Sequence, residues 1–158
     1  MIRGIHHVAL TSGDIAKTVD FYTKAFGFEV VWESAWEKGS DMIDEIVGLK
    51  GSSAKQAMLK AGNTHIEVFQ YFTPDGKAVD PKRPVSDEGY THFCVDVTDI
   101  DYEYNRLKDL GMTFHRPPPG KEELGEGPIR ATYGRDPDGN VIEIQEVLDK
   151  DFPFYLKI

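Results

Sequence analysis

The amino-acid sequence predicts an α+β protein made of two paired βαβββ modules, forming an open, cup-shaped β-sheet with the helices outside. Two internal repeats carry this prediction. The phrase "HVALTSGDI" at 7–15 returns as "HFCVDVTDI" at 92–100, and "GNTHIEVF" at 62–69 returns, one residue shorter, as "GNVIEIQ" at 139–145. Repeats of this kind indicate a duplicated structural unit. Neither half is long enough to bury a useful core alone, so we expect a single compact unit.

The first module is predicted to span residues 1–76. Alternating apolar residues indicate a strand near 2–11, and a helix follows in which Asp14 is the cap and Gly27 the end. Further apolar stretches predict strands near 28–36, 54–60 and 64–72.

The second module is predicted to span residues 89–148, after a linker at 77–88 that is rich in charge and proline. It repeats the order of the first, with a strand near 90–98 and a helix near 100–110. Its other strands are expected near 112–116, 129–134 and 140–147.

Two segments have no counterpart in the other module. Residues 38–53 form an insertion in which Ser40 could cap a short helix. The C-terminal tail at 149–158 carries Phe152, Phe154 and Tyr155, which are costly to leave in water. Each segment could be a lid, a dimer contact or simple core packing, and we expect the chain to form a homodimer.

Composition excludes several classes of partner. The formal charge of −9 disfavours nucleic acid, and no apolar run is long enough to cross a membrane. The N-terminus shows no signal-peptide pattern, and a single cysteine, Cys94, allows no internal disulfide. We therefore expect a cytoplasmic protein that acts on a small molecule.

One histidine and one glutamate fall at matching positions of each repeat. Because successive side chains of a strand point to opposite faces, His7 and His92 lie opposite the apolar residues that pack beneath the helices. Glu67 and Glu143 lie opposite their isoleucine and valine neighbours in the same way. The parity predicts that all four face the inside of the cup.

These four side chains together predict a metal site. An unpaired carboxylate on an enclosed sheet face costs several kcal/mol, and two of them repel each other. A divalent cation removes both problems, and imidazole and carboxylate are among its usual ligands. Any one of the four taken alone would more often be structural or solvent-facing.

The chain also resembles the vicinal oxygen chelate superfamily, the glyoxalase, bleomycin-resistance and dioxygenase group. The matching stretches are "HHVALTSGDIAKTVDFYTKAFGFEVV", "GNTHIEVFQY", "YTHFCVDVTDID" and "DPDGNVIEIQE". The resemblance covers both halves and implies the ligand set His7, Glu67, His92 and Glu143. It implies a bound divalent ion, which could be nickel, cobalt, manganese, iron or zinc, and a substrate with adjacent oxygens.

The ligand set resembles that of glyoxalase I, the lactoylglutathione lyase, which implies a lyase or isomerase that transfers a proton next to a carbonyl through a metal-bound enediolate. Glu143 or Glu67 could be the base, and we favour Glu143 because the adjacent "DPDGN" turn could let its strand end move. Thr11 stands where glyoxalase I usually has an arginine for the glutathione carboxylate, so we expect the glutathione hemithioacetal to be a poor substrate.

Three alternatives remain open at this point: a methylmalonyl-CoA epimerase-like enzyme, an extradiol-type dioxygenase that would not need Glu67, and a non-catalytic drug-binding protein. The remaining histidines, His6, His65 and His115, are interpreted as structural or solvent-facing. Cys94 shares the face of His92 and is expected to be a small buried thiol.

Overall fold

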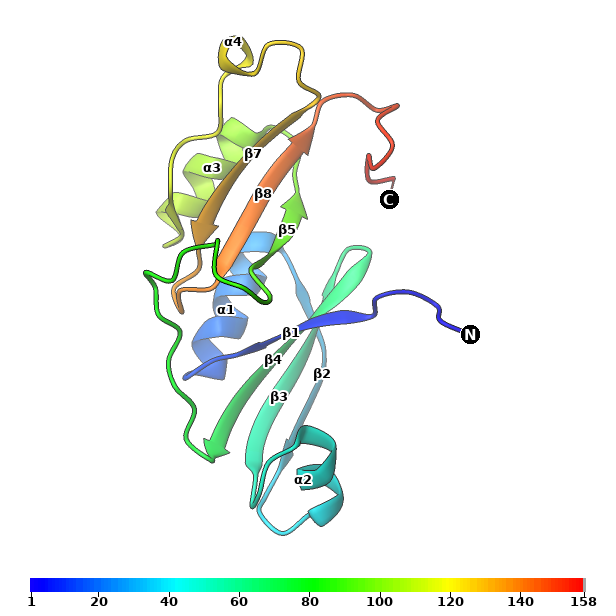
Figure 1. The fold of residues 1–158 in the computed structure, drawn as a ribbon, viewed down its shortest axis with the longest axis vertical. Coiled ribbons are helices and arrows are strands. Elements are labelled where there is room, and N and C mark those ends of the chain that lie inside the picture. The colour runs from blue at the N-terminus through cyan, green and yellow to red at the C-terminus, as the bar shows by residue number, and fades with distance from the viewer. Residues whose placement is uncertain (158) are drawn as a thin grey trace. The chain divides into compact units, whose positions relative to one another are not determined.

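The computed structural model describes residues 1–157 and divides the chain into two compact units, residues 1–78 and the part from residue 79 onward. Each unit carries one four-stranded mixed sheet (Figure 1). The boundary lies within the segment that the sequence marks as a linker.

The first unit has its strands in the order β1-β4-β3-β2, with β1 parallel to β4 and the other neighbours antiparallel. Its elements are β1 (His7–Thr11), α1 (Ile15–Phe26), β2 (Glu29–Trp36), α2 (Asp41–Val47), β3 (Ser53–Ala61) and β4 (Thr64–Thr73).

The second unit repeats this topology in the order β5-β8-β7-β6, with β5 parallel to β8. Its elements are β5 (His92–Asp96), α3 (Ile100–Asp109), β6 (Thr113–Phe114), α4 (Lys121–Leu124), β7 (Ile129–Arg135) and β8 (Val141–Val147). The α+β class and the two βαβββ modules are therefore confirmed.

The helix α1 begins and ends where the sequence predicts. The Asp14 side chain accepts a hydrogen bond from the Lys17 backbone N–H, and Gly27 ends the helix with a φ of 68°, in the left-handed region that favours glycine. One face of α1 packs on the sheet, where Tyr22 and Leu59 are fully buried. A buried side chain of this size contributes about 1.5–3 kcal/mol.

In each module, a side chain on the last strand also holds the start of the helix. The Gln70 amide oxygen of β4 accepts from the Ile15 N–H at 3.1 Å. The Glu146 carboxylate of β8 accepts from the Asp99 N–H at 2.9 Å and the Ile100 N–H at 3.4 Å. Gln70 and Glu146 each come three residues after the glutamate of the predicted metal site.

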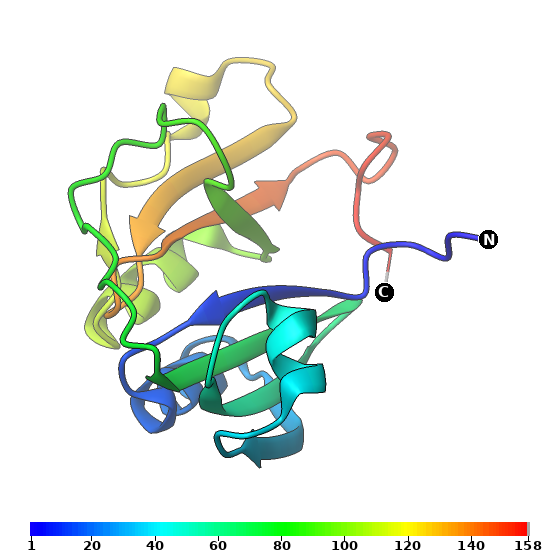
Figure 2. The ribbon, with the colours of Figure 1, turned by 60° about the horizontal axis from the view of Figure 1, so that its bottom comes forward.

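The insertion forms the short helix α2, beyond the end of β2 (Figure 2). Ser40 caps it, as predicted, by accepting from the Ile43 N–H. Asp44 then ties the helix to the start of β3 by accepting from the Gly51 N–H, the Ser52 N–H and the Ser52 hydroxyl. These hydrogen bonds hold the pKa of Asp44 below its ordinary value, chiefly through Ser52.

Some boundaries differ from the prediction. The first strand begins at His7 rather than residue 2, because the backbone hydrogen bond described between the preceding segment and β4 is the one that the His6 carbonyl accepts from the His65 N–H. The same carbonyl also accepts from the Thr64 hydroxyl. The strand expected at 112–116 is reduced to two residues, and α4 was not predicted.

The tail folds into turns in which the Phe152 and Phe154 rings meet edge to face at 4.7 Å. Phe154 remains 54% exposed. The homodimer stays a prediction, which light scattering at micromolar concentration would test. Within residues 1–157, no helix combines the length and apolar character needed to cross a membrane.

Candidate metal centre

The first module brings His7 and Glu67 together. His7 Nε2 lies 3.2 Å from Glu67 Oε2, and the two side chains are 38% and 13% exposed. Parallel pairing places Ala9 beside Glu67 and His65 beside His7, so His7 reaches the carboxylate diagonally across β1 and β4. The face is the one predicted, because the neighbours Ile66 and Val68 are buried on the other side.

The second module repeats this geometry. His92 Nε2 lies 3.1 Å from Glu143 Oε2, with the side chains 24% and 18% exposed. Cys94 pairs with Glu143 in register, so His92 again stands one step back along its strand. The two modules therefore share the side-chain geometry of the His–Glu pair as well as the sequence pattern.

Both pairs fit the donor set of a divalent ion. Two donor atoms about 2.1 Å from an ion and at right angles to each other are about 3.0 Å apart. The observed separations of 3.2 and 3.1 Å are close to that value. Each pair could therefore supply two neighbouring ligands after a shift of a few tenths of an ångström, with the imidazole in its neutral form.

The far ring nitrogen of each histidine also has a partner. His92 Nδ1 lies 2.8 Å from the Thr91 hydroxyl oxygen, and His7 Nδ1 lies 2.9 Å from His6 Nδ1. When Nδ1–H donates to such a partner, the Nε2 lone pair is left for a metal. His6 in turn stacks on His65 at 4.9 Å, so both have structural contacts, as expected.

Tyr133 is a site residue that the sequence reasoning missed. It pairs with Glu143 across β7 and β8, and its ring lies 4.7 Å from the His92 ring. Burial raises the pKa of Tyr133, and the charges of Glu143 and Cys94 raise it further. Pairing the predicted strands across the "DPDG" turn would have placed Tyr133 beside Glu143.

Cys94 differs from its expectation. The residue is exposed rather than buried, because the strand β5 lies at an edge of its sheet. Crowding on the sheet face nevertheless desolvates the thiol and, with the negative charge of Glu143, raises the pKa of Cys94 well above its usual range. His115 is exposed, its backbone N–H donates to the Tyr133 carbonyl at 2.9 Å, and its ring lies 6.4 Å from the Tyr133 ring.

The turn before β8 is tightly bonded. The Asp136 carboxylate accepts from the Asp138 and Asn140 backbone N–H groups and from the Asn140 amide. The Gly139 N–H also donates to the Asp136 carbonyl. These hydrogen bonds give no support to a mobile strand end at Glu143.

Comparison of the sequence with known proteins identifies a family. The model of the glyoxalase/bleomycin resistance protein/dioxygenase superfamily matches residues 4–144. The chain is 30% identical over 147 residues to a 2-epi-5-epi-valiolone epimerase from Actinomyces sp, covering 89% of this chain and 77% of the epimerase. It is 25% identical to the metallothiol transferase FosB of Shouchella clausii, over 91% of this chain and 80% of that protein.

Solved structures share the fold. A glyoxalase family protein from Bacillus cereus superimposes with a TM-score of 0.80 at 22% identity, over 94% of this chain and 97% of that one. A mutant of the fosfomycin resistance protein FosX from Listeria monocytogenes, solved with Mn(II) and 1S,2S-dihydroxypropylphosphonic acid, gives a TM-score of 0.60 at 20% identity, over 93% and 94%. The family model covers both modules, and the chain therefore belongs to the glyoxalase/bleomycin resistance protein/dioxygenase superfamily.

Proposed function

We propose that the chain is a metal-dependent enzyme that transfers a proton at a carbon next to a carbonyl group, as a lyase or isomerase of the glyoxalase type. The substrate would be a small molecule with adjacent oxygens. The observation that carries the proposal is the pair of His–Glu contacts, 3.2 and 3.1 Å long, at matching positions of two modules.

His7, Glu67, His92 and Glu143 would hold the ion. When bound, a divalent ion would supply Lewis-acid stabilisation of the negative charge that develops on a substrate oxygen. Two carboxylates in one ligand set allow a division of labour, in which one remains a ligand while the other takes the proton.

Either glutamate could be that base. The register neighbours of Glu143 are Cys94 and Tyr133, whose side chains carry an ionisable hydrogen, whereas those of Glu67 are Ala9 and Met58. A proton taken by Glu143 would therefore have neighbours able to share or relay it. This difference, rather than motion of the preceding turn, is our reason to test Glu143 first.

The arginine on the Glu143 face is not free to bind an anionic substrate. Arg135 pairs with Val141 on the Glu143 face, but its guanidinium donates to the carbonyls of Gly139 and Arg83. The Arg135 guanidinium is thus already engaged in hydrogen bonds within the protein. The chain as a whole is strongly acidic, with a formal charge of −9. Acyl-CoA and phosphonate substrates, which are multiply anionic, are less well served than an uncharged hydroxycarbonyl compound.

The relative named as an epimerase supports proton chemistry. An epimerase inverts a stereocentre, and removal of a proton beside a carbonyl followed by its return is a common way to do so. A metal-dependent epimerisation of a hydroxyketone is accordingly the form of the reaction that we propose to test first.

The test is hydrogen exchange in deuterated water with a panel of α-hydroxycarbonyl, acyl-CoA and catechol compounds. A carbon-bound proton of the true substrate should exchange with solvent, and Glu143→Gln should lower the exchange rate about 100-fold or more while the protein keeps some metal. Glu122→Gln, an exposed change on α4, is the control that should retain full exchange.

Two other outcomes would favour a different function for the protein. Oxygen consumption on a catechol with bound iron would replace the proposal with the dioxygenase alternative. Binding of every compound without exchange or turnover would favour a binding protein.

A further inference from the structure

The first module carries a cluster of three aromatic side chains on the same sheet face as Glu67. Glu67, Phe69 and Tyr71 alternate along β4 and therefore share a face. Trp36 pairs with Ala54, and Ala54 with Tyr71, so Trp36 joins that face from β2. We call Trp36, Phe69 and Tyr71 the aromatic corner.

The three rings pack against one another. The Phe69 and Tyr71 rings stack with centroids 5.7 Å apart and an interplanar angle of 23°. The Trp36 indole stands nearly perpendicular to both, at 76° and 6.2 Å from Phe69 and at 83° and 5.8 Å from Tyr71. Ala54, which stands between Trp36 and Tyr71 in the register of the strands, is a small residue and is 1% exposed.

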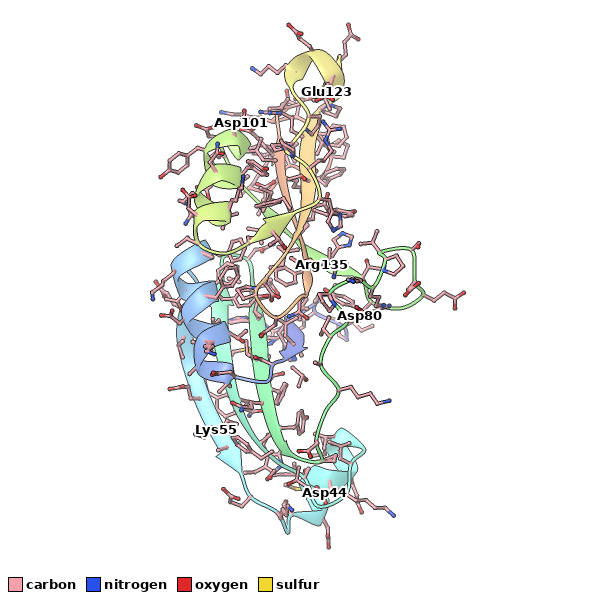
Figure 3. All side chains as sticks on the ribbon, turned by 90° about the vertical axis from the view of Figure 1, so that its left-hand side faces the viewer. Asp44, Lys55, Asp80, Asp101, Glu123 and Arg135 are labelled. Carbon is pink, nitrogen blue, oxygen red and sulfur yellow. The ribbon has the colours of Figure 1, made fainter. Side chains whose placement is uncertain are left out.

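The insertion holds the Trp36 indole in place. The Trp36 indole N–H donates to the Ser52 hydroxyl at 3.0 Å, and the Ser52 hydroxyl donates to Asp44 of α2. Figure 3 labels Asp44 at this end of the first sheet. Ser52 is 1% exposed, so the anchor of Trp36 is itself buried.

Within residues 79–157, the second module has no such corner. The positions that correspond to Phe69 and Tyr71, two and four residues after the glutamate, are Gln145 and Val147. The strand that corresponds to β2 has only two residues. A feature built in one module alone, and braced by an insertion found in that module alone, is not needed for the fold that both share.

We propose that the aromatic corner binds the ring of a cyclic, uncharged substrate whose oxygens reach toward Glu67. This inference rests on the proposed function. Flat ring faces, either aromatic or the C–H face of a cyclic polyol, stack on aromatic side chains. The Trp36 indole, perpendicular to the other two rings, would limit how a bound substrate ring can turn. Phe69 comes two residues after the proposed metal ligand Glu67 on the same face of β4. The three side chains of the aromatic corner are uncharged.

The experiment measures binding to the full chain loaded with zinc, a redox-inert and diamagnetic ion. The probes are catechol as an aromatic ring, scyllo-inosose as a cyclic polyol ketone and dihydroxyacetone as an open-chain control. Calorimetry gives affinities, and the indole N–H resonance of Trp36, assigned with Trp32→Phe, reports on contact. We expect at least one ring probe to shift this resonance and dihydroxyacetone to leave it unchanged.

The matched variants are Phe69→Leu and Phe72→Leu, since Phe72 lies on the same strand but the opposite face and is 49% exposed. Phe69→Leu should weaken the ring probe about fivefold or more, and Phe72→Leu should not. Ser52→Ala, which releases Trp36 and removes no ring, should weaken it less. Circular dichroism confirms that each variant is folded.

Binding of catechol alone identifies an aromatic substrate, and binding of scyllo-inosose alone identifies a cyclic polyol. The inference is overturned if no ring probe shifts the Trp36 resonance, or if Phe69→Leu and Phe72→Leu bind equally well. Because the measurement needs no turnover, binding of scyllo-inosose without exchange of the protons next to its carbonyl would contradict the proposed function and leave this inference standing.

Discussion

The His92–Glu143 pair is more tightly supported than the His7–Glu67 pair. His92 has a hydroxyl on its far nitrogen and the Tyr133 ring against its side, and it is 24% exposed. His7 has the His6 imidazole on its far nitrogen, with the two rings edge to face at 5.2 Å, and is 38% exposed. Duplication has thus kept the donor atoms in both modules while their supporting neighbours have diverged. The second pair is the better preorganised half of the proposed site.

The largest test of this comparison removes the donors themselves. His7→Ala, Glu67→Ala, His92→Ala and Glu143→Ala should each lower affinity for a divalent ion about 100-fold or more, because each deletes a ligand. The two changes in the second module should cost more than those in the first. Elemental analysis and chelator competition measure the effect.

Undiminished metal in all four variants would remove the site assignment. Undiminished metal in Glu67→Ala alone would instead favour the dioxygenase alternative, which needs one glutamate.

A smaller test compares the residues that face the two glutamates from the neighbouring strand, Tyr133 and Met58. Tyr133→Ala should weaken metal binding about tenfold by freeing the His92 ring, whereas Tyr133→Phe keeps the ring and should change it little. Met58→Ala should have a lesser effect, since no contact links Met58 to His7 among those described. Equal losses in Tyr133→Ala and Met58→Ala would contradict the claim that the second pair is better supported.

The smallest test concerns charge at the helices. The start of α1 is held by the neutral Gln70, whereas α3 is held by Glu146 and by Asp101, which accepts two 2.8 Å hydrogen bonds from the buried Arg130 (Figure 3 labels Asp101 on α3). These bonds hold the pKa of Asp101 below its ordinary value of 3.8. The stabilisation is therefore present above that value and is lost as the pH falls through the lowered one.

Asp101→Asn should lower stability at neutral pH by about 0.5–1 kcal/mol, a small cost because the Asp101 side chain is 64% exposed. It should also flatten the loss of stability below about pH 4. Urea unfolding at several pH values measures both, with Asp109→Asn at the other end of α3 as the control. If the pH dependence of the free energy of unfolding is unchanged in Asp101→Asn, the contact between Asp101 and Arg130 does not contribute to stability.

The sequence predicts the parts of this molecule that depend on parity and short spacing. Alternation along β4 and β8 is enough to place Glu67 and Glu143 opposite the core, and Asp14, Gly27 and Ser40 act at the helix ends because their chemistry is local. The neighbours of the two pairs depend on pairing between strands and on rotamers. Thr91 and His6 could not be assigned to the far nitrogens, nor Trp36 to Ser52, without coordinates.

The placement of Gln70 and Glu146 three residues after the two glutamates bears on how the sheet assembles. Three is an odd number, so the helix-holding side chain and the glutamate always point to opposite faces of one strand. A slip of one residue in the pairing of β4 would turn Glu67 into the core and carry Gln70 away from Ile15 at the same time. A misregistered module would thus lose its helix start and bury an unpaired carboxylate together, and correct registry is selected during folding by the same strand that carries the donor atom.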